Sequence, residues 1–337
     1  MKKYNIAVVG IGAVGIEMLR VLRQRNFPVA DLKVFARSAR DIEVDGIKYA
    51  VKPIAADAFK GIDIALFAGT EGEKGASVTY AGHAIKAGAI VIDNGADFRM
   101  DPKVPLVVPE VNAGDVKKNK GIIANPNCST IQMVVALNPI YKKVGIKRII
   151  VTTLQASSGA GRAAVEQLRE ENIQIAKGDY KNLHTSGEKY LPQQLAYNVF
   201  PHLGTFTEGD YTNEEWKLVK ETHKIMHDSK IKVSATTVRV PVRTGHSESI
   251  YIETKKTISV DEARRILSKA PGVKLIDSPK DNLYPMPIDV EGKDETFVGR
   301  IRKDPFVKNG LWLWCVADNL RKGAATNAIQ IAEELIK

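Results

Sequence analysis

The sequence has few cysteines and no long apolar run. Only Cys128 and Cys315 occur among the 337 residues, and two thiols cannot staple a chain of this size into a disulfide framework. No apolar run reaches the roughly 18 residues that are needed to span a bilayer. The opening segment, MKKYNIAVVGIGAVG, enters an expected strand directly and contains no small-residue cleavage site of a secretory signal. We therefore expect a cytoplasmic protein without a membrane segment.

Clustered charge is also scarce, although the formal net charge is +10. The lysines are scattered, and the one tight cluster, KKNK at residues 117–120, fits a solvated loop better than a nucleic-acid patch. We therefore expect small-molecule partners and no nucleic acid. A modest positive field would still help to steer acidic, phosphorylated substrates towards the protein.

Two patterns of secondary structure divide the chain. Up to residue 127, short apolar strands alternate with helix-type segments, which indicates a parallel sheet covered on both faces. Over residues 128–317 the strands are longer and alternate with polar residues, which indicates a sheet with one open face. We predict an α/β protein with a doubly wound, Rossmann-type nucleotide-binding domain and a second α+β domain on a mixed, largely antiparallel sheet. The segment ATNAIQIAEELIK predicts a terminal helix.

Gly10, Gly12 and Gly15 form a GxGxxG pattern between a predicted strand and a predicted helix. Glycines permit the tight turn and the close approach of a pyrophosphate, which then meets the helix N-terminus. We expect this turn, with Ala13 and Val14, to bind a dinucleotide. The alternative is an ordinary strand-to-helix turn.

The choice of nicotinamide cofactor depends on the segment about 20 residues farther on, LKVFARSAR. A carboxylate there would bind a ribose 2′-hydroxyl, but the chain offers Arg37, Ser38 and Arg40. Guanidinium and hydroxyl groups suit a 2′-phosphate, so we predict NADP. A solvated basic loop is the alternative.

Cys128 lies in GIIANPNCSTIQ, where an apolar strand gives way to a helix-like segment. Free N–H groups at a helix start lower the pKa of a thiol and favour the nucleophilic thiolate. A candidate base, His246, follows far downstream in RVPVRTGHSES. A small buried hydrophobe is the alternative for Cys128, and a core or surface histidine is the alternative for His246.

Five motifs occur in an order and spacing that resemble the aspartate-semialdehyde dehydrogenase family: DNGADFRMD, NPNCST, LQASSGAGR, RVPVRTGHS and VGRIRKD. The resemblance runs nearly end to end. It implies reversible, NADPH-dependent reduction of L-aspartyl-4-phosphate to L-aspartate 4-semialdehyde with phosphate release through a cysteine thioester. This reaction belongs to the biosynthesis of lysine (through diaminopimelate), threonine, methionine and isoleucine.

The same resemblance implies the organisation of the domains. Residues 318–337 would return to the nucleotide-binding domain of residues 1–127, and residues 128–317 would form the catalytic and dimerisation domain. A homodimer, or a dimer of dimers, would form through the alternating sheet of this second domain.

The resemblance also implies roles for individual side chains. Cys128 would be the nucleophile, His246 the proton shuttle and Gln155 a substrate-orienting amide. Arg239 would bind the substrate carboxylate, and Arg99 the phosphate or acyl phosphate. The other implied substrate-binding residues are Asn127, Glu214 for the amino group and Lys217 for the phosphate. Further implied cofactor contacts are Ser158, Gly159 and Asn319.

Several features have simpler alternatives. Glu214 and Lys217 also have the (i, i+3) spacing of an ordinary surface ion pair. His223 and His227 have a spacing that can hold zinc, but no metalloprotease Glu or Cys pair accompanies them, so we expect no metal site. Packing or an interface explains the alternating Trp312 and Trp314 better than a ligand does.

Two other functions are weighed against the one that the family implies. An N-acetyl-γ-glutamyl-phosphate reductase would share the fold and the cysteine mechanism, but it usually carries a glycine before its cysteine. A non-catalytic nucleotide-sensing relative would be expected to lose its nucleophile first. The complete set of Cys128, Gln155, Arg239 and His246 argues against it.

Overall fold

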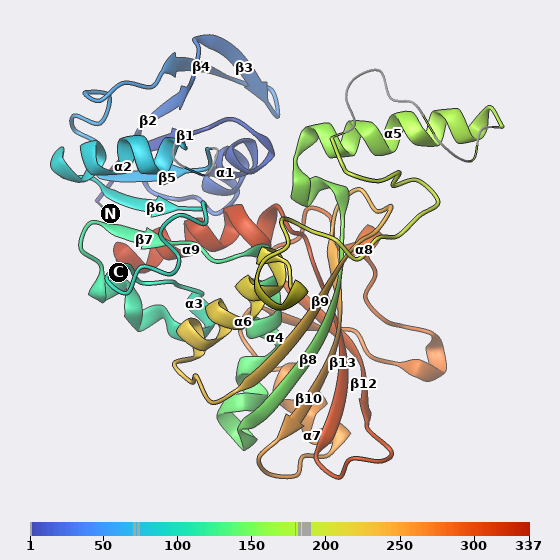
Figure 1. Cartoon of the computed structure of the whole chain (residues 1–337). Coiled ribbons are helices and arrows are strands. Elements are labelled where there is room, and N and C mark those ends of the chain that lie inside the picture. The colour runs from blue at the N-terminus through green and yellow to red at the C-terminus, as the bar shows by residue number, and fades with distance from the viewer. Residues whose placement is uncertain (1, 70–71, 73–74, 179, 181–182, 184–189) are drawn as a thin grey trace. The chain divides into compact units, whose positions relative to one another are not determined.

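The computed structural model describes residues 2–69, 72, 75–178, 180, 183 and 190–337. The chain folds into two compact units, Met1–Cys128 with Gly323–Lys337, and Ser129–Lys322, which can be followed by colour in Figure 1. Within the described residues, no helix is long and apolar enough to cross a membrane.

The first unit is built on a seven-stranded sheet with the order β3-β4-β2-β1-β5-β6-β7. Its strands are β1 (Tyr4–Val9), β2 (Val29–Ala36), β3 (Arg40–Val44), β4 (Ile47–Pro53), β5 (Ile64–Phe67), β6 (Ile90–Asp93) and β7 (Ile122–Ala124). Every neighbouring pair is parallel except β3 and β4. The core strand β5 is buried along its whole length, as expected for a parallel sheet covered on both faces.

The sequence predicts the five strands β1, β2, β5, β6 and β7, but not the antiparallel hairpin of β3 and β4. Both hairpin strands are largely exposed and alternate charged with apolar residues. Asp45 and Gly46 join them with φ angles of 50° and 78°. Such an Asp-Gly pair at positive φ is the signal of a type I′ hairpin turn, so this element was detectable from the sequence.

The C-terminal helix belongs to the first unit. The helices of this unit are α1 (Ala13–Gln24), α2 (Ala76–Lys86), α3 (Pro109–Asn112), a 3-10 helix (Ala113–Lys118) and α9 (Thr326–Leu335). In Figure 1, α9 in red lies among the blue and cyan elements of this unit. Arg25, just after α1, makes a two-point ion pair with Glu333 of α9 (2.8 and 2.7 Å). Ile329 and Ile331 are fully buried in the same core as Ile6 of β1.

The second unit is built on a six-stranded sheet with the order β11-β12-β13-β10-β8-β9. Its strands are β8 (Ile146–Gln155), β9 (Lys232–Arg239), β10 (His246–Thr254), β11 (Val273–Leu275), β12 (Thr296–Lys303) and β13 (Gly310–Ala317). The pairs β8–β9 and β11–β12 are parallel, and the other three pairs are antiparallel. This topology confirms the predicted mixed, largely antiparallel sheet.

Local sequence signals explain where the helices of the second unit begin. They are α4 (Cys128–Val144), a 3-10 helix (Ser157–Ala160), α5 (Arg162–Ala176), a 3-10 turn (Glu208–Asp210), α6 (Asn213–Met226), α7 (Val260–Leu267), a 3-10 turn (Pro279–Asp281) and α8 (Pro287–Val290). A capping box starts α6, because the Thr212 side chain accepts from the Glu215 N–H and the Glu215 carboxylate accepts from the Thr212 N–H. This cap fixes Glu214 in the first turn of α6.

The two faces of the second sheet differ in chemistry. On one face, Ser249, Tyr251, Trp312 and Trp314 alternate along β10 and β13. Tyr251 and Trp312 contact each other with ring centroids 5.0 Å apart, so Trp312 packs on the sheet. The opposite face is buried and apolar at residues such as Ile250, but it becomes polar towards the start of β10. That polar end contains most of the second unit's candidate site residues.

Candidate active site

The glycine turn after β1 has the shape that a dinucleotide requires. Gly10 has φ of 95°, and a Cβ added there would lie 2.6 Å from the Ala68 carbonyl oxygen. A Cβ on Gly15 would lie 1.9 Å from the Gly10 oxygen, whereas a Cβ on Gly12 would meet no described atom within 4 Å. The tight turn therefore requires glycine at positions 10 and 15, and the space beside the Gly12 main chain is open. Since α1 begins at Ala13, the first N–H groups of the helix are available for a pyrophosphate.

The basic residues predicted to select NADP follow β2. Arg37 and Ser38 come directly after the last residue of β2, and Arg40 begins β3. All three are exposed. The carboxyl end of β2 is where a doubly wound sheet holds the adenosine ribose, so these side chains occupy a position suited to a 2′-phosphate.

In the first unit, Arg99 is joined to the segment that leads to Cys128. Its Nε donates to the Asn125 carbonyl (2.9 Å), and its Nη2 donates to the Asn94 carbonyl (2.7 Å). Arg99 is buried, as is Asn127, and Cys128 is partly exposed as the first residue of α4. A guanidinium is thus fixed to the main chain three residues before a thiol at a helix start. The guanidinium and the start of the helix both stabilise negative charge.

In the second unit, three predicted residues meet at the ends of neighbouring strands. Gln155 pairs with Arg239 across β8 and β9, and His246 begins β10 on the other side of β8. The Arg239 Nη1 donates to the Ala156 carbonyl (2.5 Å), and the Ala156 N–H donates to His246 Nδ1 (3.1 Å). All three side chains are buried. One residue's main chain, that of Ala156, therefore holds both a guanidinium and an imidazole, and no side-chain pattern in the sequence indicates its role.

The surroundings of His246 keep its ring neutral. Burial, and then the nearby Arg239 charge, lower the pKa of His246 to about 3, although Glu214 opposes the shift. Because Nδ1 accepts the Ala156 N–H, the neutral ring carries its proton on Nε2. Nε2 has no hydrogen-bond partner among the described residues. A Cβ on Gly159 would lie 2.9 Å from Nε2, so glycine at this position leaves room beside the proton-bearing nitrogen.

Glu214 and Lys217 adjoin this group. The Gln155 amide donates to Glu214 Oε1 (3.3 Å), and Lys217 Nζ lies 3.1 Å from Glu214 Oε2. The side chains of Glu214 and Lys217 are 11% and 25% exposed. The pair therefore has the spacing of a surface ion pair, but it is largely buried and contacts a candidate catalytic side chain.

Asn319 connects the loop after β8 with the start of β10. Its Oδ1 accepts from the Gly245 N–H (2.9 Å), and its Nδ2 donates to Ser158 Oγ (2.9 Å). Asn319 and Ser158 are buried. These contacts give both residues a supporting role beside His246, and their predicted contact with a cofactor stays a prediction.

The histidine pair on α6 does not form a metal site within the described residues. His223 Nε2 bonds to the Ile231 carbonyl (2.7 Å), and His227 ends the helix in a left-handed conformation. In the part of the chain that the structure describes, no group of three His, Cys, Asp or Glu residues is arranged to hold a metal ion.

Comparisons with known proteins place both units. A family model described as "Semialdehyde dehydrogenase, NAD binding domain" matches residues 5–119, and one described as "Semialdehyde dehydrogenase, dimerisation domain" matches residues 137–322. The aspartate-semialdehyde dehydrogenase of Aquifex aeolicus (strain VF5) is 55% identical, over 99% of this chain and 98% of the relative. That of Bacillus subtilis (strain 168) is 47% identical, over 99% and 97%. A crystal structure of aspartate semialdehyde dehydrogenase II from Vibrio cholerae, complexed with ASA, matches with a TM-score of 0.93 and 42% identity, over 100% of this chain and 99% of that chain.

An NAD-binding domain followed by a dimerisation domain defines the class of semialdehyde dehydrogenases. Within that class, the chain belongs to the aspartate-semialdehyde dehydrogenase family. These matches confirm the resemblance that rested on five short motifs, and they confirm the two-domain α/β fold. They support the aspartate enzyme and not the N-acetyl-γ-glutamyl-phosphate reductase.

Proposed function

We propose that this protein is an NADP-dependent oxidoreductase that interconverts L-aspartyl-4-phosphate and L-aspartate 4-semialdehyde, with phosphate as the other product or substrate. The observation that carries the proposal is the 55% identity with a named aspartate-semialdehyde dehydrogenase along almost the whole of both chains. The reaction serves the synthesis of lysine, threonine, methionine and isoleucine from aspartate, and we expect it in the cytoplasm.

The glycine turn of residues 10–15 would hold the pyrophosphate of NADP, and Arg37, Ser38 and Arg40 would hold the 2′-phosphate. The open side of Gly12 and the start of α1 support the first assignment. The exposed basic groups after β2 support the second. Bound NADPH supplies the hydride that reduces the acyl carbon. Ser158, Gly159 and Asn319 complete the proposed cofactor contacts.

Cys128 is the proposed nucleophile. Its thiolate attacks the carbonyl carbon of the acyl phosphate, a carbon–sulfur bond forms, and the carbon–oxygen bond to phosphate breaks. After hydride reaches the resulting thioester, the carbon–sulfur bond breaks to give the aldehyde and the free thiolate. The start of α4 supports this role because its N–H groups stabilise negative charge on sulfur.

His246 is the proposed proton shuttle, and Gln155 orients the substrate. As a neutral imidazole with its proton on Nε2, His246 can donate a hydrogen bond to the oxygen that becomes negative when hydride reaches the thioester. Gln155 shares the buried face with His246 and presents an amide at the same strand end.

The charged side chains would divide the ionic groups of the substrate between them. Arg239 is proposed to bind the aspartyl carboxylate with two parallel hydrogen bonds, and Glu214 to bind the amino group. Lys217 and Arg99 are proposed to bind phosphate or the acyl phosphate. The proposed substrate set is completed by Asn127.

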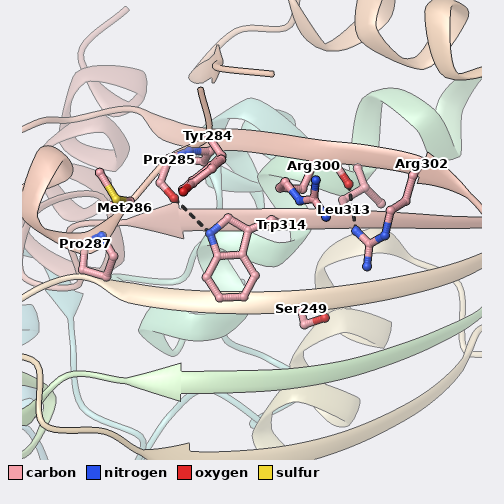
Figure 2. A pocket seen from close by; sticks show the side chains of 9 residues that line it. All are labelled: Ser249, Tyr284, Pro285, Met286, Pro287, Arg300, Arg302, Leu313 and Trp314. Atoms are coloured by element: carbon pink, nitrogen blue, oxygen red, sulfur yellow. Dashed lines mark hydrogen bonds between the residues drawn. The ribbon is translucent and has the colours of Figure 1, made fainter. Parts of the chain in front are cut away.

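The family match describes the second unit as a dimerisation domain. We propose that the homodimer forms through the face of the sheet that carries Trp312 and Trp314. This face has a hollow of about 400 Å³, and Figure 2 shows Trp314 among the residues that line it, with its Nε1 donating to the Pro285 carbonyl. Apolar side chains beside Arg300 and Arg302 are typical of an interface core with a polar rim. Sedimentation would distinguish this dimer from a dimer of dimers.

The decisive assay follows NADP reduction with L-aspartate 4-semialdehyde, with and without phosphate, beside N-acetyl-L-glutamate 5-semialdehyde. We expect phosphate-dependent turnover of the aspartyl substrate alone. Cys128→Ser is the matched control and should abolish turnover while leaving cofactor binding intact. Turnover of the acetylated substrate at an equal rate would contradict the proposed substrate.

A further inference from the structure

A buried polar row lies directly behind the predicted catalytic residues of the second unit. Glu248 of β10 pairs with Cys315 of β13 on one side and with Thr153 of β8 on the other, and Thr153 pairs with Thr237 of β9. All four side chains are fully buried. Because side chains alternate along strands, this row shares its face with His246, Gln155 and Arg239, each of which lies two positions from the row on its own strand. Nothing in the proposed reaction requires an acid in this second row.

The surroundings of Glu248 disfavour a charge. Neither carboxyl oxygen has a partner at hydrogen-bond geometry among the described residues. Its cross-strand neighbours, Cys315 and Thr153, carry no positive charge, and the neighbour from α4 is the neutral Gln132. Burial raises the pKa of Glu248 well above its usual range, and the Gln132 amide only partly opposes that shift. A buried carboxylate with no cation beside it takes up a proton instead of keeping its charge.

Gln132 connects this row to His246. Its Nε2 donates to the His246 carbonyl (3.3 Å), and its main-chain carbonyl accepts from the Cys315 thiol (3.7 Å). The side chain is fully buried. A primary amide has two N–H donors, so the donor that does not reach His246 can serve the neighbouring carboxyl group. Gln132 also lies one helical turn after Cys128, the first residue of α4.

We propose that Glu248 is a positioning residue that works as a neutral carboxylic acid: its carbonyl oxygen accepts one N–H of Gln132 and so orients the amide that holds the His246 main chain against α4. The inference rests on the proposed function, since His246 is the residue being positioned. Glu248 itself touches no reacting atom. Its part is to keep the start of β10 and the first turns of α4 in one fixed arrangement.

The first test compares three variants by steady-state kinetics. Glu248→Gln keeps an acceptor oxygen of the same shape and should keep kcat within about twofold, whereas Glu248→Leu and Gln132→Leu should each lower kcat at least ~10-fold with little change in either KM. Since both residues act through one contact, the double variant should be no worse than about the poorer single variant. Glu43→Gln, at an exposed position of β3 in the first unit, is the matched control. Full activity in Gln132→Leu, additive losses, or equal losses in Glu248→Gln and Glu248→Leu would overturn the proposal.

The second test does not depend on activity. The infrared spectrum of the wild type at neutral pH should show the carbonyl band of a protonated carboxylic acid, and subtracting the spectrum of each variant shows whether that variant has lost the band. Glu248→Gln should remove that band and Glu43→Gln should retain it. If the band is missing from the wild type, Glu248 is ionised and the inference fails even where the enzyme is active. Failure of the proposed function would instead appear as an inactive wild type that still shows the band.

Discussion

The Ala156 N–H donates a hydrogen bond to Nδ1 of His246, which assigns the proton of the neutral ring to Nε2. Together with burial beside Arg239, this contact makes His246 a hydrogen-bond donor whose charge does not change near neutral pH. Its capacity to donate is therefore the same across the physiological pH range.

The first prediction concerns the pH profile. With the pKa of His246 at about 3, the ring stays neutral through the physiological range, so kcat should show no limb near pH 6.5 that is due to this residue. His246→Gln should lower kcat about 10²- to 10⁴-fold without moving the remaining limbs. The measurement is kcat against pH for both proteins. A limb near pH 6.5 in the wild type that disappears in the variant would show that His246 titrates.

The second prediction concerns stability. The pKa of Glu248 is raised in the folded state, so the folded protein holds a proton that the unfolded chain releases above about pH 4.5. The contribution of Glu248 to the free energy of unfolding should therefore be greatest below that pH and fall as pH rises towards the folded-state pKa, by at most about 1.4 kcal/mol per pH unit. Glu248→Gln has no such proton. Urea unfolding from pH 5 to 8 should show the wild type losing stability relative to this variant, and parallel curves would count against it.

The third prediction concerns the thiols. Cys315 is fully buried, and burial raises its pKa well above its usual range, whereas Cys128 is partly exposed at a helix start. Iodoacetamide should therefore inactivate the enzyme by modifying Cys128 alone, and bound substrate should protect it. Peptide mapping checks the site. Complete inactivation with Cys128 unmodified would exclude it as the nucleophile.

The fourth prediction concerns the cofactor. A charged hydrogen bond to a phosphate contributes about 1.5 to 3 kcal/mol, or roughly 10- to 150-fold in binding. Arg37→Ala should weaken NADP by this factor and leave NAD almost unchanged, as measured by calorimetric titration. Equal weakening of both cofactors would mean that Arg37 supports the fold or binds the adenine.

The fifth prediction separates the two anion sites. Arg239→Leu should lower kcat/KM for the aldehyde at least 30-fold, since removing one partner of a buried charge pair costs about 2 to 5 kcal/mol. Lys217→Ala should instead raise the KM for phosphate, and for arsenate as a replacement oxyanion. Should both oxyanion KM values stay unchanged in Lys217→Ala, its contact with Glu214 is structural only.

Features encoded locally could be predicted from the sequence. The glycine turn at residues 10–15, the helix start at Cys128 and the alternating strand beside Trp312 and Trp314 each follow from a few adjacent residues. The Asp45-Gly46 hairpin was equally local and could have been predicted from the same rules.

Contacts that depend on strand register could not be predicted in this way. The Ala156 main chain has no distinctive side chain, and its role appears only when β8, β9 and β10 are aligned. Glu248 gave a weaker signal, because an acid two residues after His246 must share the buried face of the strand. Its neighbours Gln132 on α4 and Cys315 on β13 are 116 and 67 positions away in the chain, and no local pattern joins them.

The position of α9 affects how the protein can be made. The core around Ile6 is completed by Ile329 and Ile331, so the first unit is assembled from the two extremes of the chain. During translation, that core can close only after α9 has been synthesised, because residues 1–128 form one unit with residues 323–337. Until then the apolar surface that α9 covers is exposed to chaperones and to aggregation. A stalled or truncated chain would lack this helix, and we expect cellular quality control to remove it.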